Sequence, residues 1–421
     1  MKMNTCFLLG SGISRPAGLP SVDCITKQVL LPEHFFKHTD GTFMRVALQN
    51  QPNPISIEEQ RRQMQDISGL LRWLKGLAEL RFASDLKRSV NYEDLAYLAT
   101  QIRDDAGDEY ENPALVPLKC CVLNALPTLC FEQADKQQAL GDFAAKTMNY
   151  ISDVVEDMLN KPVQEHRWNY LKFFKEAVED KRFDLVGLFT LNHDTLLETY
   201  LRKNEVQVID GFDDENGLGI RRWKPALFDC WRNHADKLTV RLFKLHGSIN
   251  WRRFRPNEMH SDAQLRNGWL EEYAGIRSDP DKLDKEKDER DRKHEVIGRP
   301  LFLAGTFNKM LGYLNHLFLE LHYNFHRALQ ESERLFVCGY GFGDKGINSR
   351  IIDWICQFPA TTVRRIVIVD PLPFKVFQEN SRGAISRKLS SWEGNGQLNY
   401  LRCKFGNLNM TWGKVAGELL S

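Results

Sequence analysis

Short apolar runs open the chain and recur in its second half. The first run, Thr5–Leu9, stops at Gly10-Ser11-Gly12 and therefore predicts a buried strand that leads directly into a tight turn. These runs show no clean alternation of polar and apolar positions, which is typical of parallel strands covered on both faces. Comparable runs rich in Val, Leu, Ile and Phe follow at residues 185–191, 206–210, 240–245, 335–338 and 365–370.

Helical periodicity fills the long interval between the first and second of these strands. Apolar residues recur there at helical spacing in two segments and then with looser spacing: Ile67, Leu70, Leu71, Leu74 and Leu77; Ile151, Val154, Val155 and Met158; Trp168, Leu171 and Phe174. The pattern predicts an α/β fold with a doubly wound, Rossmann-like parallel sheet and a large helical insertion. We expect residues 1–30 and 181–421 to form the Rossmann-like domain and residues 31–180 the insertion.

Two further segments have a distinct pattern. Apolar positions from Met310 to Phe325 predict one amphipathic helix ahead of the strand at 335–338. Residues 279–294 are almost all charged, with both signs mixed, which indicates a solvated loop or an exposed helix.

Composition narrows the function classes. Lys and Arg number 57 against 56 Asp and Glu, so the broad positive surface of a nucleic-acid-binding protein is not expected, nor is direct sequence-specific binding. No apolar run reaches the roughly 18–20 residues that span a bilayer, and the N-terminal segment lacks a signal-peptide pattern. We therefore predict a cytoplasmic protein without membrane association. The nine cysteines include no C-x-x-C pair, which indicates reduced, mostly buried thiols and no zinc site.

The turn after the first strand is a candidate phosphate site. Gly10-Ser11-Gly12-Ile13-Ser14 stands where a strand gives way to a helix, and backbone amides at such a junction can hold a phosphate. The dinucleotide fingerprint G-x-G-x-x-G fails, because Arg15 occupies its third glycine position, and no P-loop motif occurs. By itself the turn fits a ligand-holding loop and a merely tight one equally well.

Three other strands also end in polar or glycine-rich junctions. These are Asn192-His193-Asp194, His246-Gly247-Ser248 and the segment from Gly339 to Asp344. In doubly wound folds the ligand crevice lies at this end of the strands, so all four junctions are candidates to line it. Structural roles also remain open. Asn192 and Asp194 are suited to cap the next helix, His246 to be a core histidine bonded to backbone, and the glycines to serve turn geometry.

Taken together and in order, these motifs resemble the sirtuin-like superfamily. The resemblance rests on Gly10–Ser14 with Ala17-Gly18-Leu19-Pro20, on Thr190–Asp194, on Leu245–Ser248 and on Gly339–Asp344. Within the superfamily the chain is most similar to bacterial sirtuin-like NAD hydrolases of anti-phage defence. Three segments carry that closer likeness: Asn91-Tyr92-Glu93-Asp94-Leu95, Thr195-Leu196-Leu197-Glu198, and Gly343-Asp344 with Ile347-Asn348.

The resemblance implies a role for each candidate residue. Asn192 would contact the ribose hydroxyls or the attacking water, and His246 would act as general base. Asp194 would orient the nicotinamide or brace Asn192. The remaining assignments concern the other half of the dinucleotide: Gly10, Ser11, Gly12 and Ser14 at the pyrophosphate, Gly339 and Phe342 on the adenosine side, and Asp370 at the adenine or its ribose.

The resemblance also implies the reaction and the partners. NAD would be the substrate, no metal is expected, and the chain would act as an NAD-depleting effector gated by homo-oligomerisation or by a HerA-type ATPase. Classical deacylases carry a C-x-x-C…C-x-x-C zinc module after the His-Gly motif, whereas no cysteine lies between His246 and Cys338. Two alternatives stay open: an NAD-dependent protein deacylase, and a non-catalytic assembly subunit that binds NAD or ADP-ribose.

Overall fold

The computed structural model describes most of the chain in two compact units. The first unit comprises Met1–Leu19, Pro162–Leu303 and Met310–Ser421, and the second comprises Pro20–Lys161 and Ala304–Lys309. Our sequence analysis placed the corresponding boundaries after residues 30 and 180. The described residues are 2–38, 41–46, 56–85, 89–106, 112–126, 136–214, 220–229, 237–254, 273–277, 295–297, 299–305, 309–314, 316–356, 364–407 and 409–421. The charged segment 279–294 and the cysteines at 130 and 230 lie outside them.

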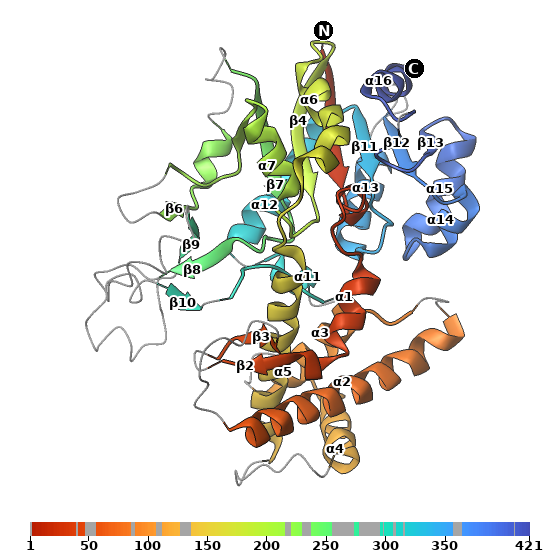
Figure 1. Cartoon of the computed structure of the whole chain (residues 1–421). Coiled ribbons are helices and arrows are strands. Elements are labelled where there is room, and N and C mark those ends of the chain that lie inside the picture. The colour runs from red at the N-terminus through yellow and green to blue at the C-terminus, as the bar shows by residue number, and fades with distance from the viewer. Residues whose placement is uncertain are drawn as a thin grey trace. The chain divides into compact units, whose positions relative to one another are not determined.

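A seven-stranded sheet forms the centre of the first unit (Figure 1). All six of its strand pairings are parallel, and the strand order is β13-β12-β11-β1-β4-β7-β5. Six of the strands were predicted from their apolar runs, which confirms the doubly wound α/β fold. The strands are β1 (Met3–Leu9), β4 (Phe183–Thr190), β5 (Gln207–Ile209), β7 (Thr239–Lys244), β11 (Arg334–Cys338), β12 (Arg365–Asp370) and β13 (Leu398–Arg402).

Both faces of this sheet are covered, as the uninterrupted apolar runs predicted. Successive side chains of a strand point to opposite faces. In β1, Cys6 and Leu8 therefore enter one core cluster while Phe7 and Leu9 enter the other. All four side chains are at most 1% exposed. A sheet packed on both sides needs apolar residues at every position, which explains the lack of alternation.

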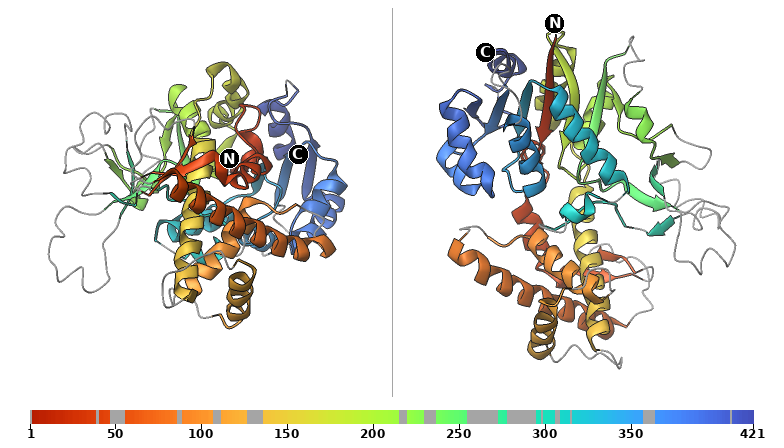
Figure 2. Two further views of the ribbon diagram at one scale, coloured as in Figure 1. Left: turned by 60° about the horizontal axis from the view of Figure 1, so that its bottom comes forward. Right: turned by 180° about the vertical axis from the view of Figure 1, so that it is seen from behind.

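Helices supply the two covering layers. Helix α12 contacts β1, β4 and β7, and the rear view shows it running along one face of the sheet (Figure 2). Helix α6 contacts β4, and α16 contacts β12. The elements are η1 (Ser11–Ile13), η4 (Glu165–Leu171), α6 (Lys172–Glu179), α7 (Leu196–Lys203), η5 (Pro225–Phe228), α11 (Lys309–Gly312), α12 (His316–Glu331), α13 (Lys345–Cys356), α14 (Phe374–Asn380), α15 (Ala384–Gly394) and α16 (Trp412–Leu420).

Two helix predictions need correction. The single helix expected from Met310 to Phe325 is two helices, α11 and α12, and Leu314 between them is 69% exposed instead of buried. Trp168, Leu171 and Phe174 do not continue the insertion. They lie in η4 and α6 of the first unit, where Phe174 packs edge-on against Phe7 of β1. Periodicity alone does not reveal which core a helix faces.

Two other groups of strands in the first unit were not predicted. Strand β13 is short and mixes apolar with polar residues, and four short strands form a separate antiparallel sheet in the order β10-β8-β9-β6. Within this second sheet Trp251 is buried and packs against Phe212 and Trp223. These segments contain few Val, Leu, Ile or Phe residues, whereas runs rich in these residues predicted the other strands. The strands are β6 (Ile220–Arg222), β8 (Trp251–Phe254), β9 (Tyr273–Arg277) and β10 (Glu295–Ile297).

The second unit is mainly helical, with one hairpin. Tyr150 of α5 organises part of its core, because its ring meets Phe35 and Phe43 of the hairpin edge-on and its hydroxyl donates to the carbonyl of Val29. The elements are α1 (Val22–Val29), η2 (Pro32–His34), β2 (Phe35–Lys37), β3 (Phe43–Arg45), α2 (Ile57–Asp85), α3 (Tyr92–Ala106), α4 (Leu115–Ala125) and α5 (Lys136–Leu159).

One motif of the resemblance has a local structural role in this unit. The Asn91 side chain accepts hydrogen bonds from the amides of Glu93 and Asp94, and the Asp94 carboxylate accepts from the amide of Asn91. This reciprocal pattern is a capping box, so these residues start α3.

None of the described helices combines the length and apolar character needed to cross a bilayer. The described His, Cys, Asp and Glu side chains form no group of three or more that is suited to hold a metal ion.

The prediction of mostly buried thiols is wrong for the seven cysteines described, because only Cys6 and Cys338 are buried.

Candidate active site

The predicted junctions lie along one edge of the seven-stranded sheet. Strand pairing matches Leu9 with Thr190 and Cys338, Thr190 with Lys244, and Cys338 with Val369. The first candidate residue of each junction follows one of these positions by one or two residues. Neighbouring strands lie about 4.8 Å apart, so the junctions are neighbours in space. Their order along the carboxyl edge is Asp370, Gly339, Gly10, Asn192 and His246.

The glycines of the first turn pack against the turn after β11. A Cβ on Gly10 would lie 2.4 Å from the carbonyl oxygen of Gly339, and one on Gly12 would lie 2.6 Å from the Cα of Gly339. Gly339 itself has φ of +66°, and a Cβ there would lie 2.7 Å from the amide nitrogen of Ile13. The need for glycine at these positions therefore has a complete explanation in the contact between two backbones.

Most amides of this turn already have acceptors. Gly10 donates to the carbonyl of Cys338 at 2.9 Å and Gly12 donates to that of Gly339 at 3.0 Å. Within η1, Ile13 donates to Gly10 and Ser14 donates to Ser11, both at 3.1 Å. These four hydrogen bonds fix the turn, and the four amides that make them are engaged within the protein.

Asn192 lies at the end of a buried hydrogen-bond chain. Its Nδ2 donates to Ser14 Oγ at 3.1 Å, and that hydroxyl donates to Asp194 Oδ2 at 2.8 Å. Asn192 is 6% exposed, and its Oδ1 is buried without a hydrogen-bond partner among the described residues. Because the chain holds the amide nitrogen, the amide oxygen faces away from Ser14. A buried acceptor without a donor is costly, and such an atom needs an explanation.

Asp194 both caps a helix and supports this chain. Its Oδ1 accepts from the amide of Leu196 at 3.1 Å, so the capping role that the sequence left open is present. Lys244 donates to the carbonyl oxygen of Asp194 and, at 2.6 Å, to Glu198 Oε1. Burial raises the pKa of Asp194 and the charge of Lys244 opposes that rise, while Glu198 adds to it. Through Oδ2, Asp194 accepts from the Ser14 hydroxyl to which Asn192 donates.

His246 bonds to a carboxylate as well as lying in a backbone turn. Its Nε2 lies 3.0 Å from Asp344 Oδ2 and 3.3 Å from the hydroxyl of Tyr313. Tyr313 also donates to Asp344 Oδ2. His246 is 4% exposed, and its ring centroid lies 6.3 Å from that of His193, the residue after Asn192. Through Nε2, His246 therefore bonds to side chains, which the open alternative of a core histidine bonded only to backbone does not include.

Two further residues hold this cluster in place. The ring of His322 stacks on Tyr313 with centroids 3.6 Å apart, and its Nε2 lies 3.1 Å from the carbonyl oxygen of Leu245. The pKa of His322 is lowered to about 3, mainly by burial and in smaller part by the neighbouring His246 and Arg350. Burial and the charge of Asp344 raise the pKa of Tyr313 well above its ordinary value. At neutral pH both rings are uncharged.

The turn after β11 is shaped by its own side chains. Phe342 has φ of +51°, and its fully buried ring packs against Tyr340 and Phe377. Asn348 donates to the carbonyl oxygen of Phe342 at 2.8 Å and accepts from the Tyr340 hydroxyl at 2.8 Å. A ligand at this turn would therefore meet the backbone of Phe342 and not its ring.

Asp370 stands at the end of β12. Its Oδ1 accepts from the amide of Leu372 at 2.9 Å. Burial raises its pKa, whereas this hydrogen bond and the charge of Arg15 oppose the rise. Asp370 thus lies on the same edge as the other candidates, two strands away from Gly10.

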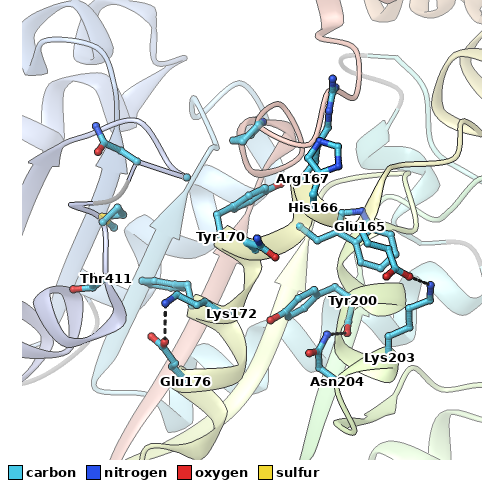
Figure 3. Close-up of a pocket in the computed structure, with 17 residues that line it drawn as sticks. Glu165, His166, Arg167, Tyr170, Lys172, Glu176, Tyr200, Lys203, Asn204 and Thr411 are labelled. Carbon is cyan, nitrogen blue, oxygen red and sulfur yellow. Dashed lines mark hydrogen bonds and ion pairs between the residues drawn. The ribbon is translucent and has the colours of Figure 1, made fainter.

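A cavity of 1120 Å³ opens elsewhere on the first unit, between η4, α6, α7 and the segment around Thr411 (Figure 3). None of the predicted site residues lines it. Its charged side chains include two ion pairs, Lys203 with Glu165 at 2.6 Å and Lys172 with Glu176 at 3.9 Å (Figure 3). The cavity is therefore distinct from the Asn192–His246 site.

Sequence reasoning missed the residues that support the site from outside its motifs. Asp344 was noted as the last residue of the Gly339–Asp344 junction and in the resemblance, without a role of its own, and Tyr313, His322 and Lys244 were not assigned to the site. The capping role of Asp344 could have been found, because Asp is favoured at the position before a helix such as α13. Tyr313 lies 31 positions from Asp344, and no local pattern links them.

Comparisons with known proteins give a limited result. No family model and no curated protein matches the chain. Among solved structures, 56 chains match. One is described as "Structural Basis for the Mechanism and Regulation of Sir2 Enzymes", with 10% sequence identity and a TM-score of 0.35, covering 99% of this chain and 92% of that chain.

Proposed function

We propose that this protein hydrolyses NAD to nicotinamide and ADP-ribose. The observation that carries the proposal is the unpartnered amide oxygen of Asn192, buried at the carboxyl edge of a doubly wound sheet on the strand next to His246. A ribose hydroxyl or an attacking water has the O–H donor that this oxygen lacks. The imidazole of His246 belongs to the side-chain type that exchanges protons near neutral pH.

The reaction breaks the bond between the ribose C1′ and the nicotinamide nitrogen. The electron pair of that bond goes to the nitrogen, which leaves as neutral nicotinamide, and a water oxygen forms the new bond to C1′. The water proton passes to His246 and from there to solvent. Asn192 would hold the water or the ribose hydroxyl in line for this attack, and Ser14 and Asp194 would hold Asn192.

The phosphate contacts need a narrower assignment than the sequence suggested. Four amides of Gly10–Ser14 already donate within the protein, so we assign the turn a shaping role beside the pyrophosphate. The Ser11 side chain is exposed there. Gly339, the backbone of Phe342 and Asp370 continue along the same edge toward the adenosine half, in the order given by the sheet.

We also propose a biological role from the ordered motifs. The likeness to bacterial anti-phage NAD hydrolases supports an NAD-depleting effector that acts in the cytoplasm. Activity would be gated by homo-oligomerisation or by a HerA-type ATPase partner. The absence of cysteine between His246 and Cys338 favours hydrolysis over protein deacylation, because the zinc module of classical deacylases has no counterpart there.

The test measures nicotinamide and ADP-ribose by liquid chromatography after incubation with NAD. It uses the protein alone and together with a HerA-type ATPase, DNA and ATP. We expect equal amounts of both products, and we expect His246→Ala to abolish them. His326→Ala, at an exposed position on α12, is the matched histidine control and should keep full activity.

Other outcomes decide between the alternatives. Consumption of NAD only when an acetyl-lysine peptide is present, with loss of its acetyl group, would favour a deacylase. Binding of NAD without any product, alone or with the ATPase, would favour a non-catalytic subunit. Turnover that survives in folded His246→Ala and Asn192→Ala variants would contradict the assigned site.

A further inference from the structure

Asp344 joins the N-terminus of α13 to His246. Its Oδ1 accepts from the amides of Gly346 at 2.9 Å and Ile347 at 3.1 Å, which is the arrangement of a helix cap. Its Oδ2 accepts from the Tyr313 hydroxyl and lies 3.0 Å from His246 Nε2. The helix amides therefore hold Oδ1 of the carboxylate, and Oδ2 faces His246.

The proton positions follow from this geometry. An ionised carboxylate only accepts hydrogen bonds, so the nitrogen that faces it must carry the hydrogen. Burial and the Asp344 charge raise the pKa of Tyr313, which keeps the phenol protonated and able to donate. His246 then donates from Nε2, and a neutral imidazole in that state has its lone pair on Nδ1.

We propose that Asp344 is a positioning residue that fixes His246 as its Nε2–H tautomer and sets the orientation of its ring. The use of that tautomer in catalysis rests on the proposed NAD hydrolysis, in which Nδ1 would take the proton of water. An acid that orients the basic histidine acts through the histidine and does not touch the substrate.

The surroundings support a tautomer set by Asp344. Tyr313 lies against both groups, and the uncharged ring of His322 stacks behind it. The guanidinium of Arg350 lies 5.8 Å from the Tyr313 ring centroid, and the His193 ring centroid lies 6.3 Å from that of His246. Of these groups, Asp344 and Arg350 carry formal charge, and Asp344 is the one that bonds to the imidazole.

The test observes the tautomer directly. The protein is labelled with ¹⁵N-histidine, and the signals of His246 are assigned by their loss in His246→Gln. Nitrogen chemical shifts and two-bond couplings distinguish Nε2–H from Nδ1–H. We expect Nε2–H in the unmodified protein, and a spectrum showing Nδ1–H would overturn the proposal without any variant.

The variant Asp344→Asn sharpens the test. The side-chain oxygen of the asparagine can still accept from the α13 amides, so its NH₂ group then faces Nε2 of His246. An Nε2 atom that accepts from this NH₂ group carries no hydrogen, which favours the Nδ1–H tautomer. We expect that change in the spectrum, together with a fall in kcat of roughly 10²-fold or more and little change in KM. Tyr313→Phe keeps the Asp344–His246 pair, and we expect its Nε2–H tautomer to persist.

The outcomes separate the positioning role from the proposed function. An unchanged tautomer in folded Asp344→Asn overturns the proposal, as does a rise in KM with constant kcat. If the unmodified protein shows no NAD turnover while Asp344→Asn still switches the tautomer, NAD hydrolysis fails and the positioning role of Asp344 stands.

Discussion

The glycine turn after β1 and the Asn192–His246 pair lie on the same sheet edge, yet they differ in how completely the protein satisfies them. In the turn, the backbones of Gly10 and Gly12 pack so closely against Gly339 that a Cβ on any of the three would clash. Four amides of the turn have acceptors within the protein. At Asn192 a buried acceptor has no partner. A motif that the fold fully explains carries little information about a ligand, whereas an unsatisfied buried atom points to one.

The two regions also differ in what removal of a side chain should do. A change in the turn forces backbone against backbone and should lower stability. A change at Asn192 removes the unsatisfied oxygen together with one hydrogen bond to Ser14, so its effect on stability should be small beside its effect on activity. Two predictions test this difference directly, and two more concern the His246 cluster and the reaction.

The largest expected effect is on turnover at Asn192. We expect Asn192→Ala to lower kcat for NAD hydrolysis by roughly 10³-fold, because the amide would position the attacking water or the ribose. The midpoint of thermal unfolding should fall by only a few degrees, since removal of the unsatisfied oxygen offsets part of the lost hydrogen bond to Ser14. Chromatography of nicotinamide and differential scanning calorimetry measure the two quantities. Full activity in the folded variant would remove Asn192 from the site.

The next effect is on stability at Gly339. We expect Gly339→Ala to lower the free energy of unfolding by at least about 2 kcal/mol, because φ of +66° is strained for alanine and its Cβ would meet the backbone of Gly12 and Ile13. Urea unfolding measures the change. Gly341→Ala is the matched control, since a Cβ there would have no described atom within 4 Å apart from Gly341 itself and its two chain neighbours. Equal stability of the two variants would contradict the close packing of the two turns.

A smaller effect concerns the acid stability of the His246 cluster. The pKa of His322 is about 3 in the folded protein, and its ordinary value is near 6.5. Between about pH 6.5 and pH 3, His322 therefore binds a proton in the unfolded chain but not in the folded protein. The free energy of unfolding falls as the pH drops through this range. Between pH 7 and pH 5 this contributes a loss of about 2 kcal/mol.

His322→Gln should abolish that contribution. Glutamine does not titrate in this range, so the variant should lose about 2 kcal/mol less than the unmodified protein between these two pH values. Urea unfolding at both pH values gives the difference. The exposed His326→Gln variant serves as the control, and an identical pH dependence of the His322 variant and the unmodified protein would show that His322 takes up its proton in the folded state.

The smallest effect is expected from a chelator. The proposed reaction uses Asn192 and His246 without a metal, so EDTA should leave the rate of NAD hydrolysis unchanged. Inactivation by EDTA that is reversed by a divalent ion would require a metal in the mechanism.

The sequence by itself determined the sheet and the edge on which the candidates lie. Apolar runs without alternation, such as Thr5–Leu9, are required when a parallel strand is covered on both faces, and parallel strands place their carboxyl ends on one edge. Asn192 and His246 were therefore predictable on one edge, whereas the strand order that makes them neighbours was not. Strand β13 and the antiparallel sheet were not predictable either, because their segments contain few Val, Leu, Ile or Phe residues.

Tertiary structure alone decided which polar atoms are satisfied. Asn192 meets Ser14 across 178 positions, and His246 meets Asp344 across 98, so no local spacing predicts either bond. It also showed that the glycines of the two turns face each other and that Trp168, Leu171 and Phe174 belong to the first unit. Local sequence sets the conformation of each segment, whereas hydrogen-bond partners and packing depend on which distant segments the fold brings together.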